Sequence, residues 1–157
     1  MSNLHNLTAH SKRVRIKVDG TNYQRAAGTA TDTSEAIDTR GFSSVLIRAG
    51  LGAITATGTV AFKVQQSSDD AATDAYDDIA GTAQALTAAA DAQKVIECEI
   101  HRPAKRYLKT IITRAVANGA IDFLEVILYN PRNGAPAQDT TIAGTMETFN
   151  TPAEGTA

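Results

Sequence analysis

The densest group of possible metal ligands is an acidic segment near the middle of the chain. Five aspartates lie between Asp69 and Asp78, and a calcium ion needs six to eight oxygen ligands. The helix–loop–helix calcium motif requires alternating acids, a central glycine and a glutamate at its twelfth position, and this segment lacks that order. A solvated turn between two strands explains the same residue types without an ion. We expect no cofactor, and leave open whether the segment 69–78 binds an ion.

The residues suited to acid–base or nucleophilic chemistry are isolated from one another in the sequence. His5 and His10 lie in an unpatterned N-terminal stretch, and His101 lies beside Arg102. The single cysteine, Cys98, falls on the inward side of an alternating segment, where a small apolar side chain is its ordinary role. A nucleophile needs a neighbouring base, and the sequence places none. It also has no phosphate loop, dinucleotide fingerprint or nucleophile elbow, so we expect a protein that is not an enzyme.

A basic cluster is the strongest argument for nucleic-acid binding. It comprises Arg102, Lys105, Arg106, Tyr107 and Lys109. The formal net charge is −2, however, and residues 67–91 carry six aspartates and no base. A cationic strand edge that prevents wrong pairing, or that meets an acidic protein, explains the cluster more simply. We therefore expect no nucleic acid as a partner.

Length and composition restrict the remaining possibilities. A chain of 157 residues suits one domain with tails. One cysteine rules out an internal disulfide framework. The N-terminus has no apolar run of the kind that a secretory signal contains, so we expect synthesis in a reducing cytoplasm. No stretch approaches the ~18 apolar residues of a membrane span, so we expect no membrane contact.

Alternation of apolar and polar residues with a period of two dominates the chain. Half-buried strands are predicted over residues 12–18, 42–49, 59–66 and 94–101. Two later strands, over 105–115 and 120–129, are apolar on both faces, which is typical of central strands or of strands that meet another subunit. Asn118-Gly119 between them predicts a hairpin turn.

Weaker patterns complete the prediction of an all-β fold. Short strands are expected over 22–26, 35–38 and 76–79. The segment 83–92 is the one candidate helix, and a loop fits it equally well. Six clear strands and two or three weak ones, linked by turn residues, predict a β-sandwich or barrel.

The two ends of the chain differ from the middle. We expect a flexible N-terminal arm over residues 1–11, a β-sandwich domain over 12–130 and an extended C-terminal tail over 131–157. The tail holds three of the four prolines, and its large apolar residues are Ile142, Met146 and Phe149. These cannot form a core, so the tail is expected to be disordered or ordered against a neighbour.

In their order along the chain, these features resemble the head decoration, or cement, proteins of tailed bacteriophages. The similar parts are the strand and acidic loop of Val64 to Gly81, the KRY strand of Lys105 to Lys109 and the NPR exit of Asn130 to Arg132. The resemblance covers about Phe42 to Pro136. The chain departs from it by having Tyr76 where another aromatic residue, such as tryptophan, is often found, and by its long acidic tail.

This resemblance implies a jelly-roll-like antiparallel β-sandwich of about eight strands with extended N- and C-terminal arms. It implies a structural protein of the virion, made in the host cytoplasm and located on the outer surface of the capsid. There it would bind the major capsid protein, cement neighbouring subunits and stabilise the DNA-filled head. The expected form is a symmetric homo-oligomer, a dimer or a trimer.

The candidates for capsid or subunit contacts are cationic residues and apolar residues on exposed strands and arms. They are Lys12, Arg13, Arg15, Arg102, Lys105, Arg106, Tyr107, Phe123, Ile127, Tyr129, Arg132, Ile142, Met146 and Phe149. Two other functions also fit an all-β chain. One is a ligand- or glycan-binding module of a phage tail or fibre, for which the chain offers four tyrosines and no tryptophan as stacking platforms. The other is a tail-tube or head-completion subunit.

Overall fold

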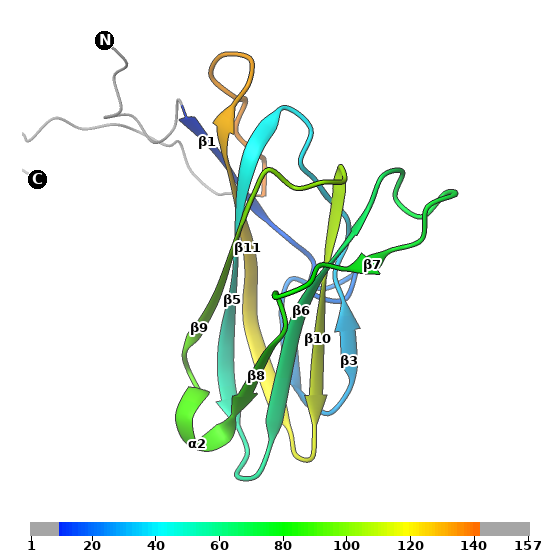
Figure 1. The fold of residues 1–157 in the computed structure, drawn as a ribbon. Helices are drawn as coiled ribbons and strands as arrows, with labels where there is room; N and C mark the ends of the chain where they lie inside the picture. The colour runs from blue at the N-terminus through cyan, green and yellow to red at the C-terminus, as the bar shows by residue number, and fades with distance from the viewer. Residues whose placement is uncertain (1–9, 142–157) are drawn as a thin grey trace, which may run out of the picture.

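Two antiparallel β-sheets packed face to face make up the computed structural model, which describes residues 10–141 (Figure 1). The predicted contact residues Ile142, Met146 and Phe149 lie outside the described residues, as does most of the N-terminal arm. Sheet A contains β1 (Ser11–Arg15), β2 (Arg25–Gly28), β5 (Phe42–Ile54), β9 (Val95–His101) and β11 (Gly119–Pro131). Sheet B contains β3 (Thr31–Thr33), β4 (Ile37–Asp38), β6 (Thr59–Ser67), β7 (Asp77–Asp78), β8 (Gln84–Thr87) and β10 (Tyr107–Ala115).

Several of these strands share one position in a sheet. β1 and β2 both pair with β11, β3 and β4 both pair with β10, and β7 and β8 both pair with β6. The sandwich therefore has eight strand positions, in the order β1/β2-β11-β5-β9 in sheet A and β3/β4-β10-β6-β7/β8 in sheet B. Successive positions alternate between the sheets except at the β6–β7 connection, which is the topology of a jelly roll. The predicted fold class is confirmed.

The inward faces of the strands follow the predicted alternation. Val60, Phe62 and Val64 of β6 are buried, as are Ile96 and Cys98 of β9. β5 is longer than predicted and runs on to Ile54. On the apolar strand β11, the apolar residues of the inner face are buried, and the others are half-buried apart from Asp122 and Asn130, which are exposed.

The predicted hairpin at Asn118-Gly119 is wrong. β10 pairs with β6 and β3, whereas β11 pairs with β5 and β1, so this turn joins the two sheets. Each of the two strands has an inward-facing row of apolar residues. Two such rows bury each other when the strands lie in opposite sheets and face across the core, and not when the strands are neighbours in one sheet. The positive φ of the turn falls on Val116 (φ 68°) instead of Gly119.

The segment 83–92 is neither a loop nor a helix throughout. It forms β8 and then one turn of helix, α2 (Ala88–Asp91). Leu86 lies opposite Val60 in the ladder with β6. Sequence analysis misses this strand because its residues, QALT, include one large apolar side chain and no alternation, and its pairing depends on the adjacent strand.

A buried ion pair lies within sheet B, and the guanidinium of its arginine also donates hydrogen bonds to sheet A. Arg114 of β10 and Asp32 of β3 are each 2% exposed, and Arg114 Nη2 lies 2.8 Å from Asp32 Oδ2. Arg114 Nη1 donates hydrogen bonds to the carbonyl oxygens of Ala26 and Gly119, both at 2.8 Å. Arg25 Nε lies 2.7 Å from the second carboxylate oxygen of Asp32. Residues of both sheets thus meet at one guanidinium.

We expect Asp32→Asn to destabilise the fold by about 3–5 kcal/mol, because it leaves the buried Arg114 charge without a counter-ion. Urea unfolding followed by circular dichroism measures this change. The matched control is Asp78→Asn, which removes the solvent-exposed pair with Lys63 and should leave the unfolding midpoint close to that of the unmodified protein. Equal shifts in the two variants would contradict a special role for the buried pair.

Candidate functional site

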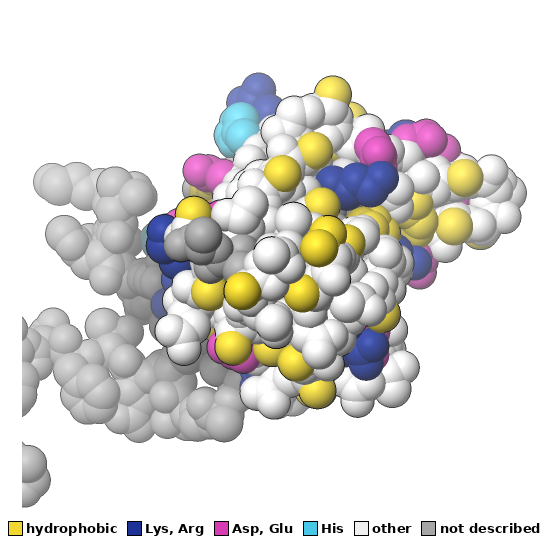
Figure 2. All heavy atoms as spheres, turned by 90° about the horizontal axis from the view of Figure 1, so that it is seen from below, with side chains coloured by type: hydrophobic (Ala, Val, Ile, Leu, Met, Phe, Trp, Pro, Cys, Tyr) yellow, Lys and Arg dark blue, Asp and Glu magenta, His cyan; other side chains and the backbone are white. Residues whose placement is uncertain are grey.

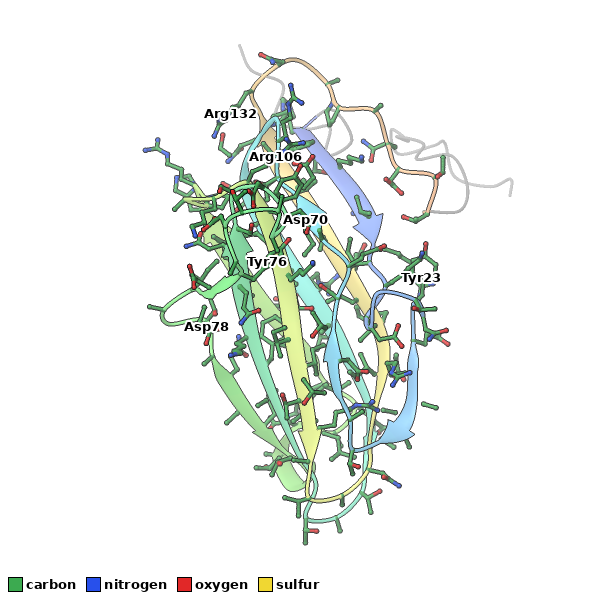
Figure 3. The ribbon with its side chains drawn as sticks, turned by 90° about the vertical axis from the view of Figure 1, so that its right-hand side faces the viewer. Tyr23, Asp70, Tyr76, Asp78, Arg106 and Arg132 are labelled. Carbon is green, nitrogen blue, oxygen red and sulfur yellow. The ribbon has the colours of Figure 1, made fainter. Side chains whose placement is uncertain are left out.

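Segments far apart in the sequence meet at one end of the sandwich, which we call the upper end after its place in Figure 1. The amide of Thr39 donates to the carbonyl oxygen of Arg106 at 3.0 Å. Arg132 N donates to the carbonyl oxygen of Gly41 at 2.8 Å, and Arg102 N donates to that of Ser43 at 2.7 Å. The KRY strand and the NPR exit are therefore neighbours, and Arg106 and Arg132 both lie at this end in Figure 3.

A shallow hollow of about 310 Å³ opens between these segments. Four cationic residues line it, namely Arg40, Lys105, Arg106 and Arg132, together with Phe42 and Pro103 among others. The sequence prediction included three of these cations and missed Arg40, which lies in a polar turn and stands out only when the turn is placed beside the other segments.

The cations at this end fall into two groups. Lys105 and Arg106 have partners: Lys105 Nζ lies 2.9 Å from Asp74 and 3.3 Å from Asp77, and Arg106 makes a two-pronged contact with Asp38. The other group consists of Arg40, Arg102 and Arg132. These three are exposed, and no carboxylate of residues 10–141 lies within 4.0 Å of their guanidinium groups.

The acidic loop that follows β6 binds its own residues and nearby lysines. Asp69 accepts hydrogen bonds from the amides of Thr73 and Asp74, at 2.8 and 3.1 Å. Asp70 accepts one from the Tyr76 hydroxyl at 2.6 Å, and these two residues lie together in Figure 3. No cluster of three or more His, Cys, Asp or Glu side chains within residues 10–141 is arranged to hold a metal ion.

The ionisation of this loop follows from the same contacts. The hydrogen bond from Tyr76 lowers the pKa of Asp70, and that from Lys63 lowers the pKa of Asp78. The hydrogen bond from Lys105 lowers the pKa of Asp74 from 3.8 to about 2. Burial, and then the hydrogen bond to Asp70, raises the pKa of Tyr76 well above its ordinary value. The loop is thus charged and internally bonded at neutral pH.

One pair resembles a nucleophile and its base. Ser44 Oγ lies 2.8 Å from His101 Nδ1, a contact created by the β5–β9 register. Ser44 is 1% exposed, so its oxygen cannot reach a substrate in this state. Cys98 is also buried, and burial raises the pKa of its thiol, which disfavours the reactive thiolate.

Among the other predicted contact residues, Tyr107 is half-buried on β10 of sheet B, and the Arg106 guanidinium lies 4.6 Å from the centre of its ring. The rest that the structure describes lie on sheet A. Lys12, Arg13 and Arg15 are on β1, where Lys12 pairs with Asp139 at 3.4 Å and Arg15 lies over the ring of Tyr23. A second group on β11 faces outward from the sheet and consists of Phe123, Ile127 and Tyr129. The Tyr129 hydroxyl donates a hydrogen bond to Glu99 of β9. The structure thus divides the predicted contact residues between two surfaces.

A second hollow, of about 450 Å³, lies on this outer surface. It is lined by Arg15, Gln24, Asp122, Phe123 and Glu125. One aromatic ring among polar side chains gives this hollow the means to bind a polar ligand that has an apolar face.

The start of the C-terminal tail packs against the outer edge of β1. The Gln138 side chain donates to the carbonyl oxygen of Ser11 at 2.9 Å, and the amide of Arg15 donates to Thr141 Oγ1 at 3.0 Å. These bonds cover part of an edge that would otherwise expose backbone groups. Part of the segment predicted as a tail therefore lies against the sandwich.

Comparison with known proteins identifies no family for the chain. No protein-family model matches it, and no curated protein is detectably similar in sequence. One similar solved structure is the CBM22-1 xylan-binding domain from Paenibacillus barcinonensis Xyn10C, with 16% sequence identity and a TM-score of 0.42. The alignment covers 78% of this chain and 94% of that domain. An overlap of this quality carries no inference about ligands.

The described helix is too short to cross a membrane.

We expect Lys105→Met to return the pKa of Asp74 from about 2 toward 3.8, because it removes the cation that stabilises the carboxylate. A lowered pKa stabilises the folded loop above pH ~4, and this stabilisation is lost as the pH falls toward 2. NMR titration of the Asp74 carboxyl carbon measures the midpoint. Lys63→Met is the control, since it should raise the pKa of Asp78 and leave that of Asp74 unchanged. An unmoved Asp74 midpoint in Lys105→Met would contradict this assignment.

Proposed function

We propose that the chain is a structural protein of a bacteriophage virion that binds the outside of the major capsid protein shell and cements neighbouring capsid subunits. The observation that carries this proposal is the group of three exposed arginines, Arg40, Arg102 and Arg132, at the upper end. Two of the three sequence signatures shared with decoration proteins border the same hollow. The third, the acidic loop, contacts it through the pair between Asp74 and Lys105.

The chemistry of this end favours recognition of an acidic protein surface. A guanidinium group stays protonated at neutral pH, so it cannot act as a general base, but it forms paired hydrogen bonds with carboxylates. The hollow is open, which suits contact with another surface better than enclosure of a small molecule. The chain has a net charge of −2, so a cationic end also orients the molecule as it approaches an acidic partner.

Weak individual contacts are sufficient for a protein that coats a shell. When many copies bind one particle and each spans more than one subunit, every contact makes the next one effectively intramolecular. Cementing then raises the free energy needed to separate capsid subunits, and no reaction is required.

We expect the double substitution Arg40→Glu and Arg132→Glu to weaken binding to purified heads lacking this protein by roughly tenfold or more, because it places like charges against an acidic surface. Co-sedimentation with the heads at increasing salt measures affinity and its electrostatic share. Lys63→Glu, on the outer face of sheet B, is a single charge reversal away from this end and should bind as the unmodified protein does. Equal occupancy by all three proteins would contradict the proposal, and rings in micrographs of the purified protein would favour a tail-tube or head-completion subunit.

A second candidate function is a ligand- or glycan-binding module of a phage tail or fibre. The hollow on sheet A favours it, because Phe123 offers a ring face while Gln24, Asp122 and Glu125 offer hydrogen-bonding groups beside it. Stacking on a ring combined with polar contacts is a common way to hold a sugar.

If this second function holds, titration with oligosaccharides should shift the NMR signals of residues around Phe123, and Phe123→Ala should abolish the shifts. The ring lies over Gly50, where an added Cβ would come within 2.3 Å of Phe123 Cε1, so Gly50→Ala is a second way to displace it. Tyr76→Phe, on the other side of the molecule, is the control. Absence of shifts across a panel of plant and bacterial glycans would contradict this function.

A further inference from the structure

We propose that two copies of this chain associate through the outer face of sheet A, related by a two-fold axis that lies in the interface and runs along the strands. The inference rests on the arrangement of side chains on that face and does not depend on what the upper end binds.

The strand register fixes which side chains are neighbours on the outer face. In antiparallel sheets, directly opposite residues point to the same side. Four rows therefore cross the face from β1 to β9, the last of them starting at β11. They are Ser11–Tyr129–Ser44–His101, Arg13–Ile127–Leu46–Glu99, Arg15–Glu125–Arg48–Glu97 and Phe123–Gly50–Val95.

Charge is distributed unevenly across this face. Its β1 edge carries the cations Arg13 and Arg15, and its β9 edge carries the anions Glu97 and Glu99. Between them, the row through Arg15 continues with Glu125 and then Arg48, so its charges alternate in sign. Arg48 lies 2.8 Å from Glu97 and 3.5 Å from Glu125, which holds this row in place.

A two-fold axis along the strands, passing between β11 and β5, reverses each row when a second copy is laid on the face. Arg15 then opposes Glu97 of the second copy, and Arg13 opposes Glu99 of the second copy. In the middle of the face, Glu125 opposes Arg48 of the second copy. Each of these charges meets its opposite, and each contact occurs twice, as a symmetric dimer requires.

The apolar side chains agree with the same axis. Ile127 opposes Leu46 of the second copy, so the two half-buried aliphatic residues of the central strands cover each other. An outward face exposed to water is normally polar in a sandwich.

The other in-plane symmetry is unfavourable. An axis perpendicular to the strands brings each edge of the face against the same edge of the second copy. The arginines of β1 would then oppose arginines, and the glutamates of β9 would oppose glutamates, which is electrostatically repulsive. The charge pattern therefore selects the axis parallel to the strands.

The area of the outer face determines the affinity that we expect for the dimer. Four strands spaced at about 4.8 Å and four rows spaced at about 6.8 Å give a flat area roughly 20 Å on each side, which places the contact in the small interface class. We therefore expect a dimer that dissociates on dilution.

The experiment is sedimentation velocity of the full chain from about 1 μM to 1 mM, with two charge reversals, Arg13→Glu and Glu99→Arg. Each reversal alone places like charges together at two symmetric positions and should weaken dimerisation roughly tenfold or more. In an equimolar mixture, the glutamate introduced at position 13 of one copy meets the arginine introduced at position 99 of the other. The unmodified Arg13 and Glu99 meet on the opposite side of the interface. The mixture should therefore dimerise again.

Recovery on mixing separates an interface effect from damage to the fold, because a misfolded variant is not repaired by a second variant. Arg132→Glu, at the upper end, is the control and should dimerise as the unmodified chain does, which separates this test from that of capsid binding. A monomer at all concentrations, a trimer, or reversals without effect would overturn the proposal. So would a dimer that forms only after truncation at Thr141, since the tail would then be the natural cover of this face.

Discussion

The buried pair of Arg114 and Asp32 is the constraint that fixes how the two sheets lie against each other. A charge inside a core is costly unless a counter-ion and hydrogen bonds compensate for the lost hydration. Here the counter-ion comes from β3, beside Arg114 in sheet B, while the carbonyl acceptors are at Ala26 and Gly119 in sheet A. Sliding one sheet past the other by a residue would break these bonds together, so the pair favours a single alignment of the sandwich. Replacing both charged residues with apolar ones can preserve the stability of the fold. It would also remove the bonds that favour a single alignment of the two sheets.

At the surface of the molecule, several charged side chains pair around the acidic loop. Aspartates of the segment 69–78 pair with Lys63 of β6, with Lys105 just before β10 and with Lys109 of β10, so these lysines are engaged within the molecule. This internal matching explains why a segment with many carboxylates offers no metal site in the described structure. The guanidinium groups of Arg40, Arg102 and Arg132 at the upper end, by contrast, have no carboxylate of residues 10–141 within 4.0 Å. The lower end, seen face-on in Figure 2, presents mainly uncharged side chains with charged groups around its rim, so the two ends differ in chemistry.

The sequence predicts well what depends on alternation within one strand and poorly what depends on the partner of a strand. The buried residues of β6 and β9 follow from a period of two, whereas that period predicts only a sandwich or barrel and leaves the jelly-roll arrangement open. The residue types of the turn at Asn118-Gly119 suit a hairpin, whereas the inward apolar rows of both flanking strands place them in opposite layers. Arg114 lies on the inward side of its strand, as Leu108 and Ile112 do. A charged residue at such a position can be interpreted only once Asp32 is known to lie beside it. Arg40 escapes prediction for a similar reason, because its neighbours at the upper end come from distant segments.

The two proposed surfaces have a geometric relation that follows from the direction of the symmetry axis. A two-fold axis parallel to the strands leaves the strand direction unchanged, so the upper ends of both copies point the same way. A dimer of this kind presents two sets of exposed arginines side by side, and it can engage two sites on one surface, which strengthens attachment through effective concentration. An axis perpendicular to the strands would instead point the upper ends in opposite directions and suit the bridging of two separate particles. The pattern of Arg13, Arg15, Glu97 and Glu99 favours the first arrangement, in which the proposed dimer and the proposed contact with a shell would reinforce each other.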